Sequence, residues 1–271
     1  MSGLVATIEG IGYWGNGLSS WDAARDYVRT GALPVDAPSR PSPQLLAPNE
    51  RRRAPETVAV ALEVALAACT AAGRDPKSLP SVFASTHGDL AITDYMCTTL
   101  AEAPHAISPT RFHNSVHNAA AGYWTIGAGC MQATTALSAF DATFAEGLLE
   151  ALAQLADDSA ADDNADDKAI LLVGYDNAAV GALPSVNRCS GLLGAALVLS
   201  RQPHARAHAP QLRATLVDAH APPPAGALAR LAAGNAMVPM LSLFEALAQR
   251  GDFALLHAGH GRALRLELSH D

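Results

Sequence analysis

Short apolar runs alternate with longer stretches of mixed polarity along most of the chain, and this alternation predicts strands followed by helices. In the longer stretches the apolar residues recur at helical spacing, which is typical of helices packed on a sheet. The predicted strands are 4–11, 81–85, 131–136, 169–174, 194–200, 211–217, and a hairpin of 253–257 with 263–268. The predicted helices are 21–30, 55–72, 89–101, one from 116, one from 138, and 239–250.

The helix that follows Ser138 has the clearest pattern in the chain. Its large apolar residues fall on one face, as expected for a helix that covers a sheet. These residues are Phe140, Phe144, Leu148, Leu149, Leu152 and Leu155.

Two segments lack such a pattern and are predicted to be loops. The stretch from Pro34 to Pro48 is rich in proline and has little helix or strand signal. The stretch from Asp157 to Asp167 combines acidic residues with alanine, which indicates a solvated loop, with a binding tail as the alternative.

The order of these elements predicts an α/β fold. Residues 1–201 are expected to form a mostly parallel five-stranded sheet with helices on both faces. Residues 202–271 repeat a shorter pattern of strand, helix and hairpin, and are expected to pack on the first part. No linker clearly divides the two into independent domains.

Composition and charge exclude several classes of function. Hydrophobic residues make up 49% of the chain, and the net charge of −8 argues against nucleic acid as a partner. No apolar run is long enough for a membrane span, and the N-terminus lacks the pattern of a signal peptide. Cys69, Cys97, Cys130 and Cys189 are widely spaced, which favours reduced thiols and a cytoplasmic location.

Three short motifs carry a resemblance to a known family. They are Glu9–Gly12 in the first strand, Asn118–Gly122 followed by an aromatic residue, and Thr134–Ala136 before the strongest helix. Together they resemble the N-terminal domain of β-ketoacyl synthases, and the chain is most similar to the chain-length-factor-like members found in aryl polyene clusters. The resemblance covers residues 2–201 well and the remainder weakly. It implies a thiolase-like half-fold with a truncated second half, and no cofactor.

The resemblance places a catalytic cysteine of condensing enzymes at the turn before that strongest helix. Leu137 and Ser138 occupy this elbow position here, and the nearest thiol, Cys130, precedes the strand. Ser138 with Asp141 fits a helix-capping pair. The alternative is that Ser138 is a nucleophile, which would require a base within hydrogen-bond reach.

Ketosynthases also use two histidines from the second half of their fold, and the resemblance implies that both segments are missing here. Gly259–Gly261 stands where the family has a Gly-Phe-Gly-Gly loop, which puts an oxyanion site in doubt. His257 and His260 are accordingly interpreted as ordinary hairpin residues.

One segment combines small residues with possible channel residues. His113 and His117 have a spacing that would suit a metal, but no third ligand recurs nearby, so no metal site is predicted. The resemblance places Phe112–Trp124 beside a partner's active site, and residues such as Ala120 would permit close approach there. The predicted acyl-channel or interface residues are Phe112, His113, His117, Tyr123, Trp124 and Phe140, with a place in the core as the alternative for the aromatic ones.

The run Arg51, Arg52 and Arg53 precedes a helix N-terminus, where positive charge does not stabilise the helix. It is a candidate docking site for an acidic acyl carrier protein, with pairing to local carboxylates as the alternative.

The resemblance implies a non-catalytic, chain-length-factor-like subunit. Such a subunit would pair with a catalytic ketosynthase, act with an acyl carrier protein, and limit the growing acyl or polyene chain. The alternatives are a divergent acyltransferase or ketosynthase that uses Ser138, and a scaffold without a role in chain length.

Overall fold

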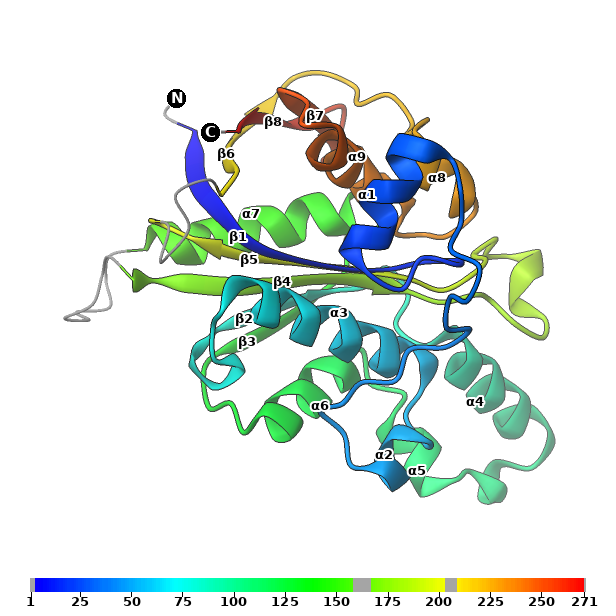
Figure 1. Ribbon diagram of the computed structural model, residues 1–271. Coiled ribbons are helices and arrows are strands. Elements are labelled where there is room, and N and C mark those ends of the chain that lie inside the picture. The colour runs from blue at the N-terminus through cyan, green and yellow to red at the C-terminus, as the bar shows by residue number, and fades with distance from the viewer. Residues whose placement is uncertain (1–2, 158–166, 203–208, 271) are drawn as a thin grey trace.

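The computed structural model describes residues 3–157, 167–202 and 209–270, and its centre is one eight-stranded sheet (Figure 1). The strand order is β3-β2-β4-β5-β1-β6-β8-β7. The strands are β1 Leu4–Trp14, β2 Ser81–Ala84, β3 Thr134–Leu137, β4 Ala169–Asp176, β5 Leu193–Ser200, β6 Gln211–Val217, β7 Phe253–His257 and β8 Ala263–Ser269.

The sheet differs from the predicted one in strand direction, and the strands β6, β7 and β8 of residues 202–271 extend it. Among the described strands, only the pairings of β2 with β3 and with β4 are parallel. All the other pairings are antiparallel, because β4 returns directly to β5 and the hairpin adds β7 and β8 without a crossover helix. Residues 1–201 contribute five adjacent strands, β3-β2-β4-β5-β1, as expected, and the α/β class with helices on both faces is confirmed. The expectation that these five strands are mostly parallel is wrong, since two of their four pairings are antiparallel.

Helices cover both faces of the sheet, and each face has its own hydrophobic core (Figure 1). On one face α7, α9 and α1 enclose the first core, and on the other face α3 and α6 enclose the second. The helices are α1 Trp21–Thr30, α2 Pro48–Arg51, α3 Glu56–Ala72, α4 Leu90–Glu102, α5 Pro109–His113, α6 Ala119–Ala128, α7 Thr143–Ala156, α8 Ala227–Leu231 and α9 Leu241–Gln249.

Helix α3 lies unusually close to β1, which explains two glycines of that strand. A Cβ at Gly12 would lie 2.0 Å from the carbonyl oxygen of Val64, and one at Gly10 would lie 2.2 Å from that of Ala68. Only glycine permits such an approach of helix to strand. The small side chains of α3 thus pack tightly on the sheet, as an alanine-rich core requires.

The excursion from α4 to α5 is a weakly buried part of the helical layer. Helix α4 buries only Leu90 and Ile92 within the chain, and α5 buries no residue. In Figure 1 both helices project from the lower right of the molecule, below the sheet. The helix predicted from Val116 begins instead at Ala119, because a tight turn separates it from α5.

The described part of the chain contains no helix that is both long enough and apolar enough to cross a membrane. The acidic segment predicted as a loop lies almost wholly in residues 158–166, outside the described residues.

Candidate functional site

The ends of the three parallel strands meet at one edge of the sheet and place polar segments side by side. Such edges are where open α/β sheets bind ligands, because the loops that follow parallel strands converge there. After β2 come Ser85 to Gly88, after β3 come Ser138 to Phe140, and β4 ends at Asp176.

The carboxylate of Asp176 binds the loop that follows β2. Its carboxylate accepts hydrogen bonds from Ser85 Oγ at 2.8 Å, from the Thr86 N–H at 2.9 Å and from the His87 N–H at 3.1 Å. The side chain is fully buried, and this burial raises its pKa while the hydrogen bonds oppose the shift. Asp176 thus fixes the loop after β2 to the end of β4.

The turn between β3 and α7 is built on a second polar network. The Ser138 hydroxyl donates to the carbonyl oxygen of Thr86 at 2.9 Å. The Thr143 hydroxyl accepts from the Ala139 N–H at 2.9 Å and donates to the carbonyl oxygen of Phe140 at 2.6 Å. Between them Phe140 adopts a left-handed backbone with φ 49°, and its side chain is 81% exposed.

One prediction about this turn is wrong. Ser138 does not cap the helix, because its hydroxyl bonds to Thr86 and α7 begins only at Thr143. Leu137 is the last residue of β3, Ser138 begins the turn that follows, and the left-handed residue of this turn is Phe140. We call the segment Ser138–Thr143 the elbow.

The elbow carries no activated nucleophile. Ser138 donates to a backbone carbonyl oxygen, which is not a base that could accept its proton for chemistry. Cys130 is buried and its thiol donates to the carbonyl oxygen of Leu79 at 3.5 Å. Cys189 is also buried, and desolvation raises the pKa of its thiol, which disfavours the reactive thiolate.

The histidines are divided between this edge and the surface. His117 lies half-buried in the turn before α6, with Nε2 2.8 Å from the carbonyl oxygen of Ser85. His113 is exposed at the end of α5. His87, which sequence reasoning missed, has its Nε2 3.0 Å from Asn187 Nδ2. The described residues contain no cluster of three or more side chains suited to a metal ion.

The hairpin turn lies beside the elbow, although the two are far apart in sequence. A Cβ at Gly259 would lie 3.9 Å from that of Ala142, and His260 adopts a left-handed backbone between two glycines. His257 is half-buried at the end of β7 and His260 is exposed.

The predicted channel residues separate into surface and core positions. Phe112 is 60% exposed on α5, whereas the half-buried Tyr123 donates to Asn114 Oδ1 at 3.1 Å. Trp124 is fully buried, and its ring packs against Phe83 with 6.4 Å between centroids. Ala120 is buried as well. Trp124 therefore belongs to the aromatic core, and neither Trp124 nor Ala120 is exposed for contact with another subunit.

The three consecutive arginines also differ from one another. Arg51 is half-buried, donates to the carbonyl oxygen of Leu46 at 3.0 Å, and its charge lowers the pKa that burial raises at Glu63. Arg52 bonds to Asn49, and Arg52 and Arg53 are exposed. A docking surface on this run would consist of Arg52 and Arg53, with Arg51 turned toward the fold.

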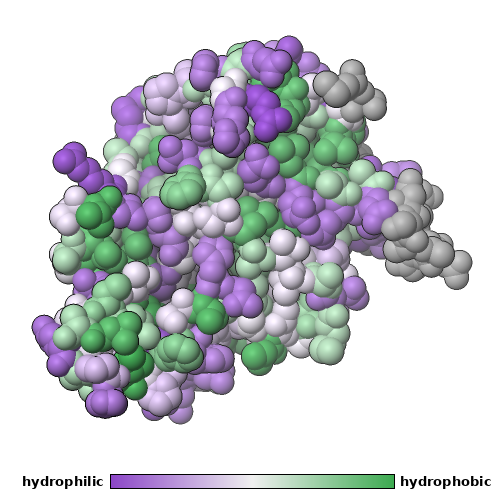
Figure 2. All heavy atoms as spheres, turned by 180° about the vertical axis from the view of Figure 1, so that it is seen from behind, coloured by the Kyte–Doolittle hydropathy of each residue, from purple (hydrophilic) through white to green (hydrophobic). Residues whose placement is uncertain are grey.

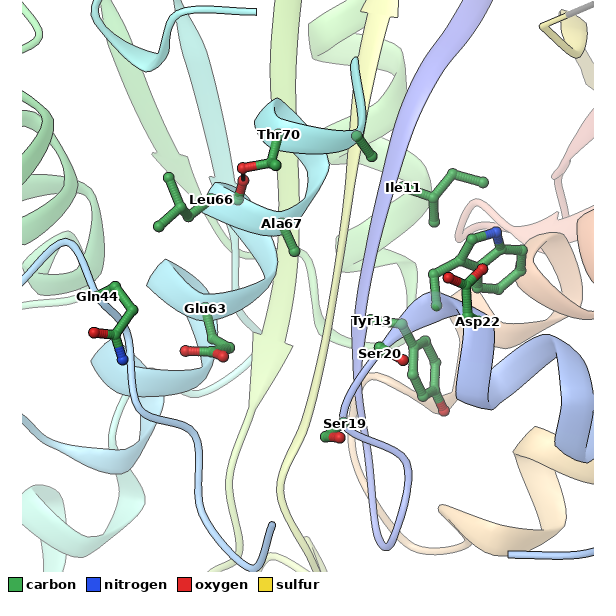
Figure 3. A pocket seen from close by; sticks show the side chains of 12 residues that line it. Ile11, Tyr13, Ser19, Ser20, Asp22, Gln44, Glu63, Leu66, Ala67 and Thr70 are labelled. Atoms are coloured by element: carbon green, nitrogen blue, oxygen red, sulfur yellow. Dashed lines mark hydrogen bonds between the residues drawn. The ribbon is translucent and has the colours of Figure 1, made fainter. Parts of the chain in front are cut away.

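A groove of about 440 Å³ lies between α1 and α3, along β1 (Figure 3). Tyr13, Glu63 and Leu66 lie on its walls, and Figure 3 shows Gln44 and Glu63 at one end of it. Residues of the elbow take no part in this groove.

Sequence reasoning missed Thr86, Asp176 and Thr143. A signal for the first two exists, because polar residues directly follow two predicted strands that end at the same edge. Thr143 could not be identified, since its role depends on where the helix begins.

Comparisons with known proteins identify the fold. The family model described as "Beta-ketoacyl synthase, N-terminal domain" matches residues 21–241. No curated protein sequence matches the chain. Among solved structures, a complex of a ketosynthase with its chain length factor from Xenorhabdus doucetiae is similar at a TM-score of 0.73 and 20% identity. The alignment covers 97% of this chain and 99% of that chain.

A further solved structure has a similar extent of similarity. The ishigamide ketosynthase/chain length factor matches at a TM-score of 0.70 and 15% identity, over 97% of this chain and 99% of that chain. By contrast, a β-ketoacyl synthase from Burkholderia phymatum matches at 0.56 and 15% identity, over 93% of this chain but only 71% of that chain. These similarities confirm the thiolase-like, ketosynthase-like fold.

Proposed function

This chain belongs to the β-ketoacyl synthase N-terminal domain family, and we propose that within it the chain is a non-catalytic subunit that pairs with an active ketosynthase. Its role is that of a chain length factor, which limits an acyl chain made by the partner. The observation that carries this proposal is the elbow. The turn that would present a nucleophile presents Phe140 instead, with a left-handed backbone and an exposed ring.

The lack of a catalytic set at this edge supports a role without chemistry. Condensation requires a thiolate and groups that polarise the second substrate. In the described residues the elbow holds a serine bonded to a carbonyl oxygen, and the thiols of Cys130 and Cys189 are buried. A nucleophile at this place would need a base, and Ser138 faces the backbone of Thr86 instead.

The free edge of β3 supports a partner subunit. β3 is the last strand of the described sheet and pairs only with β2, so its outer edge carries unpaired backbone groups. Two large apolar residues precede this strand at the surface: Ile126 is 83% exposed and Met131 is 95% exposed. An exposed strand edge beside apolar side chains is a surface that a second subunit covers.

The α4–α5 excursion extends the same kind of surface. Leu100 is 54% exposed, Phe112 60% and Val116 50%. Figure 2 shows apolar residues gathered at the lower left, on the end of the molecule that α4 and α5 form. A helix layer that buries so little within its own chain gains its stability from contacts elsewhere.

The extent of the structural matches supports a reduced form of the fold. The chain aligns end to end with chains of two ketosynthase and chain length factor structures, but with 71% of one separate ketosynthase and 46% of another ketosynthase. This difference in coverage supports the proposal that the chain lacks the segment in which ketosynthases carry their two histidines.

The finer features of the proposal follow from this role. The partner's growing acyl or polyene chain would end near Phe140 and His117, and the exposed Arg52 and Arg53 would attract an acidic acyl carrier protein. The resemblance to chain-length-factor-like proteins of aryl polyene clusters supports a polyene as the product.

A condensation assay on three samples tests the proposal. The chain alone, a co-encoded ketosynthase alone, and the two together are each given acyl and malonyl carrier-protein substrates. We expect no product from the chain alone and full-length products only from the pair. Turnover by the chain alone, lost in Ser138→Ala, would establish an enzyme and overturn the proposal.

A further inference from the structure

Phe140 combines two features that pairing with another subunit does not by itself require. Its backbone lies in the left-handed region and its ring is exposed. Among the described residues, the other non-glycine residues with positive φ have local reasons: Arg250 ends α9, and His260 lies between two glycines of the hairpin turn. A bulky residue in this conformation is a rare outlier that persists only when its surroundings enforce it.

Thr143 is the residue that enforces the conformation. Its hydroxyl is buried, with 1% of the residue exposed, and it bonds to the backbone on both sides of the strained peptide. It accepts from the N–H of Ala139 at 2.9 Å and donates to the carbonyl oxygen of Phe140 at 2.6 Å. The Thr143 hydroxyl thus connects the N–H of Ala139 to the carbonyl group of Phe140, the residue whose φ is unfavourable.

A second layer of contacts prevents Thr143 itself from moving. Thr143 opens α7, and the next residue, Phe144, is buried with its ring 6.0 Å from that of Phe244. On the other side, Thr86 receives the hydroxyl of Ser138, and Asp176 holds Thr86 by its N–H. The elbow is therefore anchored to β4 and to the core beneath α7.

We infer that Thr143 is a positioning residue for chain length, which holds the Phe140 ring in one fixed orientation as the end wall of the acyl channel of the partner complex. This inference rests on the proposed function and deepens it. The ligand is a long apolar acyl chain, because an exposed aromatic ring recognises apolar surface. A rigid ring ends such a chain at a defined carbon, whereas a mobile ring would permit a range of lengths.

The test compares four variants in the complete complex of this chain, its ketosynthase and a carrier protein. Thr143→Val keeps the shape of the side chain and removes the hydroxyl, whereas Thr143→Ser keeps the hydroxyl. Phe140→Ala removes the wall itself. Thr70→Val is a matched control, because the Thr70 hydroxyl bonds to the Leu66 carbonyl oxygen on the exposed face of α3.

We expect Phe140→Ala and Thr143→Val to shift the principal product by at least one two-carbon unit or to broaden the product distribution. Thr143→Ser and Thr70→Val should give the wild-type distribution. In the isolated chain, hydrogen exchange of the segment Ser138–Asp141 should be at least tenfold faster in Thr143→Val than in Thr143→Ser, because the Ala139 N–H loses its acceptor.

The outcomes separate this inference from the proposed function. If the wild-type chain forms no complex with a ketosynthase, the proposed function fails and the inference with it. If the complex forms but Phe140→Ala or Thr143→Val leaves the product lengths unchanged, the inference alone is overturned. If Thr143→Val prevents pairing, hydrogen exchange of the isolated variant distinguishes a positioning role from a role in the fold. Faster exchange confined to Ser138–Asp141 supports a positioning role, and a general increase shows that Thr143 serves the fold instead.

Discussion

At the residue scale, the strained turn at Phe140 links the chain's sequence to its proposed role. The ring is 81% exposed, so little of its apolar surface is buried within the chain. The cost of the positive φ is therefore not offset by packing, and it should appear in the stability of simple substitutions.

We predict that Phe140→Gly is more stable than Phe140→Ala by about 1 kcal/mol, because glycine adopts a positive φ without a Cβ clash whereas alanine does not. Urea unfolding of the two variants measures the difference. Equal stabilities would show that the backbone at this position is not strained in solution.

Hydroxyl residues at this turn show the limit of local sequence reasoning. Ser138 followed by Asp141 matches a capping pair, yet the hydroxyl bonds to Thr86, which is 52 positions earlier in the chain. Thr143 instead accepts the hydrogen bond from the backbone of this turn, because the 3₁₀ segment Phe140–Ala142 separates Ser138 from the first residue of α7. The sequence pattern identifies the turn, but the partner of each hydroxyl depends on strands that are brought together only by folding.

At the scale of elements, one buried ion pair connects α3 to the sheet. Arg74 follows α3, and its guanidinium binds both carboxylate oxygens of Glu9 on β1, at 2.7 and 2.9 Å, and Asp167 at 2.6 Å. The side chains of Arg74 and Glu9 are 7% and 5% exposed. The pair lies beside the bulge of β1, where the register to β5 shifts between Ile8 and Gly10.

We predict that Arg74→Met lowers the free energy of unfolding by about 3–5 kcal/mol, because it removes the positive charge that faces the buried Glu9 carboxylate. The matched control is Arg25→Met, which breaks an exposed ion pair with Asp22 and should cost under about 1 kcal/mol. Thermal or urea unfolding gives both values. A loss at Arg74 no larger than at Arg25 would contradict the role assigned to this pair.

A buried carboxylate gives a second element-scale prediction, which concerns pH. Glu245 on α9 accepts from the N–H of Leu228 at the start of α8, and burial raises its pKa despite this bond and the charge of Arg230. An acid with a raised pKa in the folded state stabilises the fold below its unfolded pKa. This contribution is lost as the pH rises through the folded value.

Relative to Glu245→Gln, the wild type should therefore gain stability as the pH falls from neutral toward about 4.3, the ordinary pKa of glutamate. Unfolding free energies of both proteins, measured across this range, test the sign. A difference that does not vary with pH, or that grows with rising pH, would show that Glu245 is ionised without cost in the fold.

The elements that sequence predicts well are those with strong periodicity. The helices at 21–30, 55–72 and 89–101 and the hairpin agree with α1, α3, α4, β7 and β8 to within a few residues. Strand direction could not be predicted, because the connection of β4 to β5, residues 177–192, is long enough for a parallel crossover as well as for an antiparallel return. The short helices α2 and α5 lie in segments where proline hides their pattern.

At the scale of the whole molecule, the sheet ends at two outer strands, each with exposed apolar residues on it or beside it. β7 ends one side of the sheet and carries the exposed Phe253, whereas β3 ends the other side beside Ile126 and Met131. Motif resemblance predicted a partner surface near Phe112–Trp124. Within this segment Ala120, Ala121 and Trp124 are in the core, whereas Phe112 and Val116 are exposed. The edge of β3 could not be recognised from sequence, because its position at the end of the sheet depends on the strand order.

The mass of the complex in solution tests the central claim most directly. The chain is co-expressed with a co-encoded ketosynthase, purified through a tag on the ketosynthase, and measured by size-exclusion chromatography with light scattering. We expect a one-to-one complex for the wild type and for Phe253→Arg on the far edge. We expect no complex for Met131→Arg, since an unpaired charge at a buried interface is costly. A monomeric chain that never co-purifies with the ketosynthase, or a complex that Met131→Arg leaves intact while Phe253→Arg abolishes it, would contradict the account.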